Sequence, residues 1–185
     1  MLKILISSIA LLLTPPAEAG ESLVFPIIDS KKIIFDGNVF QIGLHATNDN
    51  SLGNFVFSIH RNGFLIKISV LDGTSPSLIL PQQYNWPKDV LGVRLGQGAH
   101  ETTIRYFALG STEVAEIGAI GSNAACIYQR PRENGVVEAI DEDRNKIIVT
   151  KYKIESRTVR QLGERRLPLA HAEAVRKLCE AYNLR

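Results

Sequence analysis

The residues with the most definite chemistry are two cysteines, Cys126 and Cys179. An even pair of cysteines in an exported chain predicts a disulfide, because the compartments outside the cytoplasm are oxidising. Free thiols and metal ligands are the alternatives, but the sequence has no C-x-x-C motif and no histidine at a ligand spacing. We therefore expect a Cys126–Cys179 disulfide and no metal site.

Local signatures of catalysis are missing from the sequence. It has no G-x-S-x-G nucleophile elbow, no Walker loop, no G-x-G-x-x-G and no H-E-x-x-H. The triplet Gly96-Gln97-Gly98 is a bare G-x-G without the helix that a phosphate site needs after it. We expect no enzymatic activity and no cofactor. The alternative is a hydrolase whose catalytic residues meet only in three dimensions.

Histidines and clustered carboxylates are the residues that could form such a site. A surface or structural role is the simpler interpretation of each histidine, because a site needs partners within reach. The densest acidic cluster lies in an expected hairpin turn and lacks the alternating oxygen ligands and central glycine of a calcium loop. Whether these residues converge is a question for the structure. They are His45, His60, His100, His171, Asp141, Glu142 and Asp143.

One loop, at 82–88, has residues that suit protein recognition. Tyr84 and Trp86 lie there in a segment bounded by prolines. Exposed tyrosine and tryptophan are typical anchors of protein interfaces. The alternative is that Trp86 folds back and covers the core.

A second loop, at 130–134, carries Arg130 and Arg132 beside a cysteine-bearing strand. Arginine makes bidentate contacts with carboxylates, so both residues suit an acidic partner. The same residues would also be ordinary in a surface loop. We take Tyr84, Trp86, Arg130 and Arg132 as the candidate partner-binding residues.

The first 19 residues predict an export signal. Lys3 is followed by an apolar segment at 4–13 and by Ala17-Glu18-Ala19, which has small residues at the cleavage positions. The apolar segment is too short for a membrane anchor, since spanning a bilayer takes about 20 residues. We expect a periplasmic or secreted protein in which residues 20–185 form a single domain.

Charge is unevenly distributed along the exported part. Residues 20–150 carry 11 basic and 14 acidic side chains, whereas residues 151–185 carry 9 basic and 4 acidic ones. A basic end can bind nucleic acid or anionic lipid. An exported protein rarely meets nucleic acid, so we interpret the basic end as a solvated surface.

The elements that must position these residues are mostly β-hairpins, and the clearest is at 54–70. Asn62-Gly63 separates two runs of alternating apolar residues, which predicts a two-residue type I′ turn. With that turn, Ile59 lies opposite Ile66, Phe57 opposite Ile68 and Phe55 opposite Val70. We expect all six side chains on one buried face.

Further hairpins are expected around Asp36-Gly37 and between segments 136–141 and 146–154. The polar segment 158–166 is interpreted as a linker. Residues 168–183 predict a helix, with an apolar stripe that would place Cys179 on its buried side. The stripe consists of Val175, Leu178, Cys179 and Tyr182.

These elements predict a mainly β protein: an antiparallel β-sandwich or barrel built from hairpins, with one C-terminal α-helix packed on the sheet. Export without catalytic motifs favours a protein-binding module of the cell envelope, of the inhibitor or immunity type. Its expected partner is another protein of the envelope or exterior, with no role for nucleic acid. A small-ligand carrier is the main alternative, because β-barrels enclose cavities.

Overall fold

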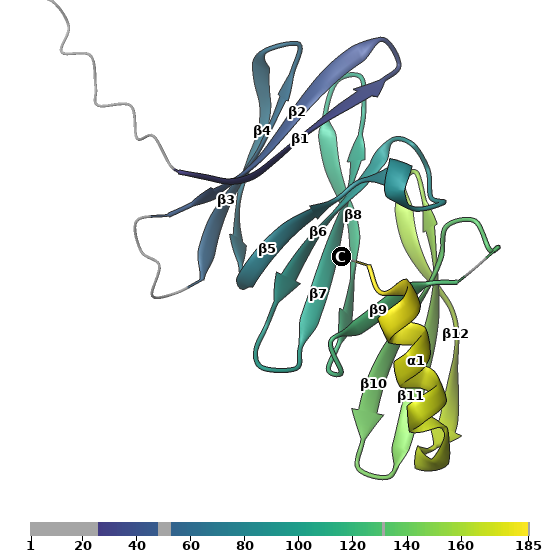
Figure 1. Ribbon diagram of the computed structural model, residues 1–185. Coiled ribbons are helices and arrows are strands. Elements are labelled where there is room, and N and C mark those ends of the chain that lie inside the picture. Colours follow the sequence, from purple (N-terminus) through teal and green to yellow (C-terminus); the bar gives the residue numbers. More distant parts are fainter. Residues whose placement is uncertain (1–25, 48–52, 131, 185) are drawn as a thin grey trace, which may run out of the picture.

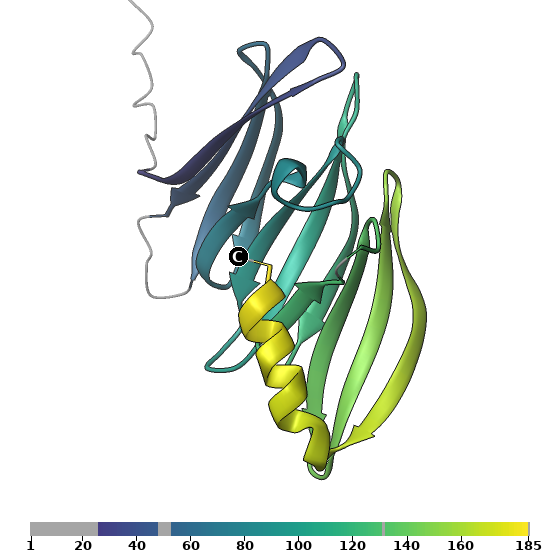
Figure 2. The same cartoon turned by 45° about the vertical axis from the view of Figure 1, so that its right-hand side comes forward.

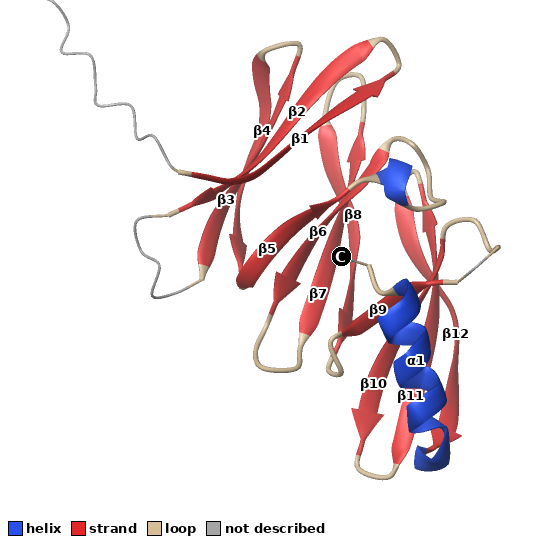
Figure 3. Cartoon of the chain, viewed as in Figure 1, coloured by secondary structure: helices blue, strands red, loops and turns tan. Residues whose placement is uncertain are grey.

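The computed structural model describes residues 26–47, 53–130 and 132–184. Twelve strands form three four-stranded antiparallel sheets, and one α-helix, α1 (Ala172–Tyr182), follows the last strand (Figure 3). The predicted mainly β class with a C-terminal helix is therefore confirmed. The predicted export signal at 1–19 lies outside the described residues.

Each sheet is a meander of consecutive strands. Sheet A contains β1 (Ile27–Phe35), β2 (Asn38–Ala46), β3 (Asn54–Arg61) and β4 (Phe64–Asp72). Sheet B contains β5 (Thr74–Ile79), β6 (Val90–Gly96), β7 (Thr102–Leu109) and β8 (Val114–Ser122). Sheet C contains β9 (Cys126–Gln129), β10 (Val136–Asp143), β11 (Lys146–Glu155) and β12 (Thr158–Pro168).

The sheets follow one another as layers along the molecule, with sheet B in the middle (Figures 1 and 2). Sheets A and B share one core, in which the rings of Phe57 and Phe107 lie 4.7 Å apart. A second core joins the other face of sheet B to sheet C. Because sheet B is covered on both faces, β6 is an almost continuous apolar run rather than an alternating one.

Sheet C packs on sheet B with one face, and α1 covers part of its other face. Val137 and Ala139 of β10 belong to the core shared with sheet B, whereas Ile140 belongs to a smaller cluster beneath α1. This alternation follows from the period of two in a strand. The helix is therefore the last layer, and it leaves the outer face of sheet A as the opposite end of the stack.

The predicted Asn62-Gly63 turn is confirmed, with φ of 50° and 87° at its two residues. The predicted Asp36-Gly37 turn is also confirmed, with φ of 48° and 70°. Positive φ at both central positions is what a type I′ turn requires.

The register predicted for the β3–β4 hairpin is wrong beyond its second residue pair. A β-bulge at Ile66 places Lys67, not Ile66, opposite Ile59. Ile68 and Val70 then lie opposite Ser58 and Val56 on the outer face, where they are 60 % and 62 % exposed. One inserted residue reverses the orientation of every side chain that follows it.

The segment 158–166, predicted as a linker, is instead part of β12. This eleven-residue edge strand pairs with β11 along its whole length. Its polar composition is what an edge strand carries when it is exposed to solvent. The polar side chains of segment 158–166 therefore indicate an exposed edge strand and not a linker.

The helix is shorter than predicted. It begins at Ala172, after a 3₁₀ turn at Leu169–His171, and it ends at Tyr182. Of the predicted apolar stripe, Val175 is buried, whereas Leu178 and Tyr182 are partly exposed. No helix in the described part of the chain is long and apolar enough to cross a membrane.

Candidate functional site

Trp86, predicted as an exposed anchor, is a core residue. It is 6 % exposed and packs edge-to-face on Tyr106, with ring centroids 5.4 Å apart. Tyr84 is half-buried against Trp86, also at 5.4 Å. The 3₁₀ turn at Pro81–Gln83 begins the loop whose tryptophan fills the second core. Trp86 is therefore buried rather than exposed, as in the alternative of a core role, and a partner contact by Tyr84 stays a prediction.

Arg130, the second predicted contact, is held in an ion-pair network. Its guanidinium lies 2.7 Å from Glu133 and 3.0 Å from Glu138. Glu138 is only 2 % exposed, and it also accepts hydrogen bonds from the Tyr128 hydroxyl and from Arg165. Burial, reinforced by the Glu138 carboxylate, raises the pKa of the Tyr128 hydroxyl, so Tyr128 remains a donor. Arg130 thus balances a buried charge.

Arg132 is exposed at the tip of the same loop, with φ of 66°. Nothing in its position conflicts with a partner contact, which stays a prediction. The two loops meet: the Asn85 side chain donates a hydrogen bond to Asn134, and the Gly135 N–H donates one to the Asn85 carbonyl. They form one rim beside an open pocket of about 410 Å³ that Lys153 also lines.

The histidines do not gather into one site. His100 and His171 are exposed on separate elements. His45 and His60 line the same groove on sheet A, where a hydrogen bond of 2.9 Å joins His45 Nε2 to Ser58 Oγ. The described residues contain no group of three or more histidine, cysteine, aspartate or glutamate residues that could hold a metal ion.

The acidic cluster also differs from its predicted place. β10 continues to Asp143, so the turn is Arg144-Asn145 and the carboxylates lie on the strand. Asp141 accepts a hydrogen bond from the Asn123 N–H. Glu142 points to the helix side of sheet C, because it follows Glu138 and Ile140 at alternate positions of β10 and side chains alternate across a strand.

The cysteines lie as predicted. Cys126 on β9 and Cys179 on α1 are joined in a disulfide, with Cα atoms 5.7 Å apart. The chain then continues to Asn183 and Leu184, and the Leu184 N–H donates a hydrogen bond to the Ile127 carbonyl. The disulfide and this pairing together attach the helix to the free edge of sheet C.

No other sheet covers the outer face of sheet A in the described part of the chain (Figures 1 and 2). Side chains that alternate with the core residues of β1 to β4 project from it. Five of them are large, apolar and more than half exposed, and they surround a polar centre. We call this set the apolar rim: Ile27, Ile34, Leu65, Ile68 and Val70.

The centre of this face is a groove of about 390 Å³ with small residues as its floor. Gly43 leaves room for the His45 imidazole, since a Cβ atom on Gly43 would lie 2.6 Å from His45 Nε2. Ser58 fixes the ring from the neighbouring strand, and Lys32 and His60 are among the other residues that line the groove. Imidazoles and an ammonium group inside an apolar rim suit a partner with carboxylates among apolar side chains.

Comparisons with family models, curated proteins and solved structures found no match for this chain.

The sequence gives a weak signal for this surface. In β4, apolar residues occur at positions that face both sides of the strand. A regular hairpin register therefore assigns Ile68 and Val70 to the core. Only the bulge moves them outward, and no residue of the FLIKISVLD segment marks its place. The groove had a clearer signal, because Gly43 stands inside an alternating strand, where glycine often marks a close approach.

Proposed function

We propose that the chain is a protein-binding module of the cell envelope or exterior that docks its partner on the outer face of sheet A. The observation that carries this proposal is the apolar rim. Side chains of this size are rarely exposed together on one face of a soluble protein unless that face binds something. The predicted export signal and the Cys126–Cys179 disulfide support a location in an oxidising compartment.

Docking on this face would use side chains rather than strand addition at its edge. β4 is an edge strand, but it carries a bulge at Ile66 and the charged Lys67 on its core-facing side. Bulges and inward-pointing charges on edge strands hinder pairing with another strand. The apolar side chains of Ile68 and Val70 remain available beside that protected edge.

The polar groups of this face favour one kind of partner. Lys32 forms no ion pair among the described residues, and His45 and His60 lie in the same groove. The partner is therefore a protein with an apolar patch that includes aspartate or glutamate. In the narrower inhibitor or immunity form of this proposal, that partner is an enzyme whose activity falls when the complex forms.

The test compares proteins captured from an envelope extract by the exported chain and by two variants. Ile68→Glu places a negative charge in the apolar rim. Leu169→Glu is the matched control, because Leu169 is an exposed apolar residue on the 3₁₀ turn beside α1. We expect a partner that the wild type and Leu169→Glu retain and that Ile68→Glu loses.

Two outcomes would contradict the proposal. Equal capture by Ile68→Glu and the wild type would show that sheet A is not the docking face. A concentration-dependent dimer of the wild type that Ile68→Glu abolishes, measured by analytical ultracentrifugation, would identify a second copy as the occupant. Binding to the proposed partner should also weaken with added salt, because part of it is ionic.

A further inference from the structure

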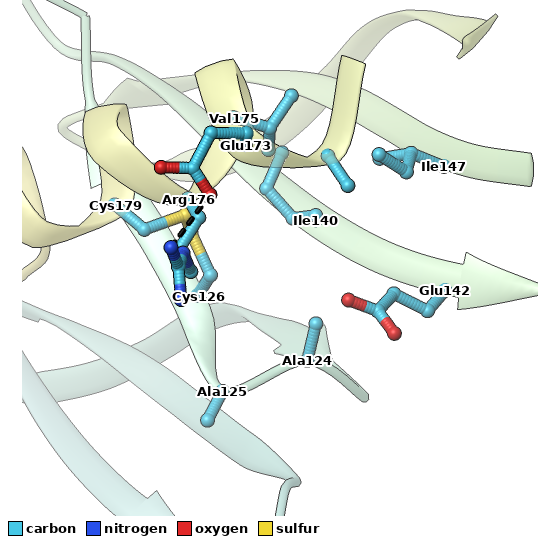
Figure 4. Close-up of a pocket in the computed structure, with 11 residues that line it drawn as sticks. Ala124, Ala125, Cys126, Ile140, Glu142, Ile147, Glu173, Val175, Arg176 and Cys179 are labelled. Atoms are coloured by element: carbon cyan, nitrogen blue, oxygen red, sulfur yellow. Dashed lines mark hydrogen bonds and ion pairs between the residues drawn. A yellow bond between two sulfur atoms is a disulfide. The ribbon is translucent and has the colours of Figure 1, made fainter. Parts of the chain in front are cut away.

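An open groove of about 460 Å³ lies beside the first half of α1, next to the cluster through which the helix packs on sheet C (Figure 4). Ile140 and Ile147 form its wall on the sheet, and Ala172 and Val175 face them from the helix. Val175 is the only buried residue of α1, and the groove is open where the small, partly buried Ala124 and Ala172 line it. The volume lies in the range of small-ligand sites, which are mainly apolar with few polar groups.

The groove has a fixed geometry. At one end the Cys126–Cys179 disulfide ties the helix to β9. At the other, Asn123 holds the backbone of Glu142 through two hydrogen bonds: it accepts one from the Glu142 N–H at 2.7 Å and donates one to the Glu142 carbonyl at 3.1 Å. Preformed walls reduce the ordering cost that a ligand must overcome.

Glu142 supplies the groove with an unbalanced negative charge. Its carboxylate points from β10 into the space in front of Ala124 and Ile140 (Figure 4). Within the described residues that carboxylate forms no ion pair. Arg176 also lines the groove, but Glu173 holds its guanidinium in an ion pair and Glu180 lies 4.0 Å from it.

We propose that this groove binds a small organic cation, a primary amine carried on a short unbranched hydrocarbon chain. The hydrocarbon lies against Ala124, Ala172 and the outer edge of the cluster that contains Ile140 and Ile147, and the ammonium group meets the Glu142 carboxylate at the open end. Charge complementarity selects the amine over an alcohol of equal length, and it rejects a carboxylate. This site lies on sheet C, so it is independent of docking on sheet A.

Titration calorimetry with hexylamine, hexan-1-ol and hexanoate at pH 7 tests the proposal on the exported protein with its disulfide intact. We expect hexylamine to bind about two- to fivefold more tightly than hexan-1-ol, the range of an exposed ion pair, and hexanoate to bind more weakly than both. The methyl NMR signals of Ile140 and Ile147 should shift with hexylamine, while those of Ile68 should not.

Two variants separate the charge from the cavity. Glu142→Gln should remove the preference for hexylamine over hexan-1-ol. Asp143→Asn is its control, because it removes the neighbouring charge on the other face of β10 and should leave the preference intact. Ala172→Phe should fill the groove and reduce binding of both probes at least tenfold, with Ala124→Leu as the second variant if the first does not fold.

The proposal is overturned if the wild type binds neither hexylamine nor hexan-1-ol, if hexanoate binds as tightly as the amine, or if Glu142→Gln keeps the amine preference. It is also overturned if both groove-filling variants fold and bind hexylamine as the wild type does, because the amine would then lie elsewhere.

Discussion

Ile66 and Leu71 both reach the core between sheets A and B, although they are five residues apart on the same strand. In a regular strand, residues at an odd separation point to opposite faces. The bulge at Ile66 removes that conflict, because it adds one residue to β4 relative to β3. The same bulge turns Ile68 and Val70 outward, so one irregularity completes the core and places two of the five residues of the apolar rim.

This register predicts a large loss of stability for one of two neighbouring substitutions and almost none for the other. Leu71→Ala should lower the free energy of unfolding by about 2–5 kcal/mol, because Leu71 is fully buried. Val70→Ala should change it by less than about 0.5 kcal/mol, because Val70 is exposed. Urea denaturation of both variants gives the two values. A larger loss of stability for Val70→Ala than for Leu71→Ala would contradict the bulge and support the regular hairpin register.

Local signals in the sequence were sufficient for the turns and for most strands. Asn62-Gly63 and Asp36-Gly37 specify their hairpins because few other residues adopt two successive positive φ values. The bulge at Ile66 and the burial of Trp86 depend instead on contacts with sheets A, B and C that are distant in sequence. Tertiary packing decided those features, and the proposed docking surface was missed with them.

Trp86 should now behave as a core residue in experiments. Trp86→Ala should destabilise the fold by about 3–5 kcal/mol, since the ring is buried against Tyr106 in the core between sheets B and C. Partner binding by the folded fraction should stay unchanged. Thermal unfolding and a binding assay at low temperature measure the two effects separately. Weakened binding with an unchanged thermal midpoint would show that Trp86 contacts the partner and would contradict its role in the core.

The disulfide should be complete in protein purified from the cell envelope, where we propose that the chain is located. Thiol titration in denaturant without reductant should detect no free thiol, because the described cysteines are paired. The double variant Cys126→Ala/Cys179→Ala should lose about 4 kcal/mol, the chain-entropy value for a separation of 53 residues. Two reactive thiols in protein purified from the envelope would contradict this prediction.

The buried Glu138 depends on its hydrogen-bond donors. Tyr128→Phe removes the hydroxyl that donates to Glu138 and should cost about 1–3 kcal/mol, because the carboxylate stays buried with one donor fewer. Tyr182→Phe is the matched control, since Tyr182 is 45 % exposed, donates no hydrogen bond to a buried carboxylate among the described residues, and should show almost no change. Chemical denaturation of both variants compares the two losses. Equal stability of both variants would show that the network around Arg130 does not need Tyr128.

Gly43 links the shape of the sheet A groove to its proposed function. In Gly43→Ala the new Cβ would lie 2.6 Å from His45 Nε2 and 3.1 Å from Ser58 Oγ, so the imidazole must swing away and lose its hydrogen bond. We expect partner binding to fall at least fivefold, equivalent to about 1 kcal/mol. Stability should change little, because the ring can move toward solvent.

Gly163→Ala is the control for Gly43→Ala, because Gly163 also lies in a strand and a Cβ there would meet no atom within 4 Å. It should leave affinity unchanged. The NMR chemical shifts of the His45 ring should move in Gly43→Ala and stay constant in Gly163→Ala. If the His45 signals move while affinity does not, the groove is not part of the docking surface, and recognition must rest on the apolar rim alone.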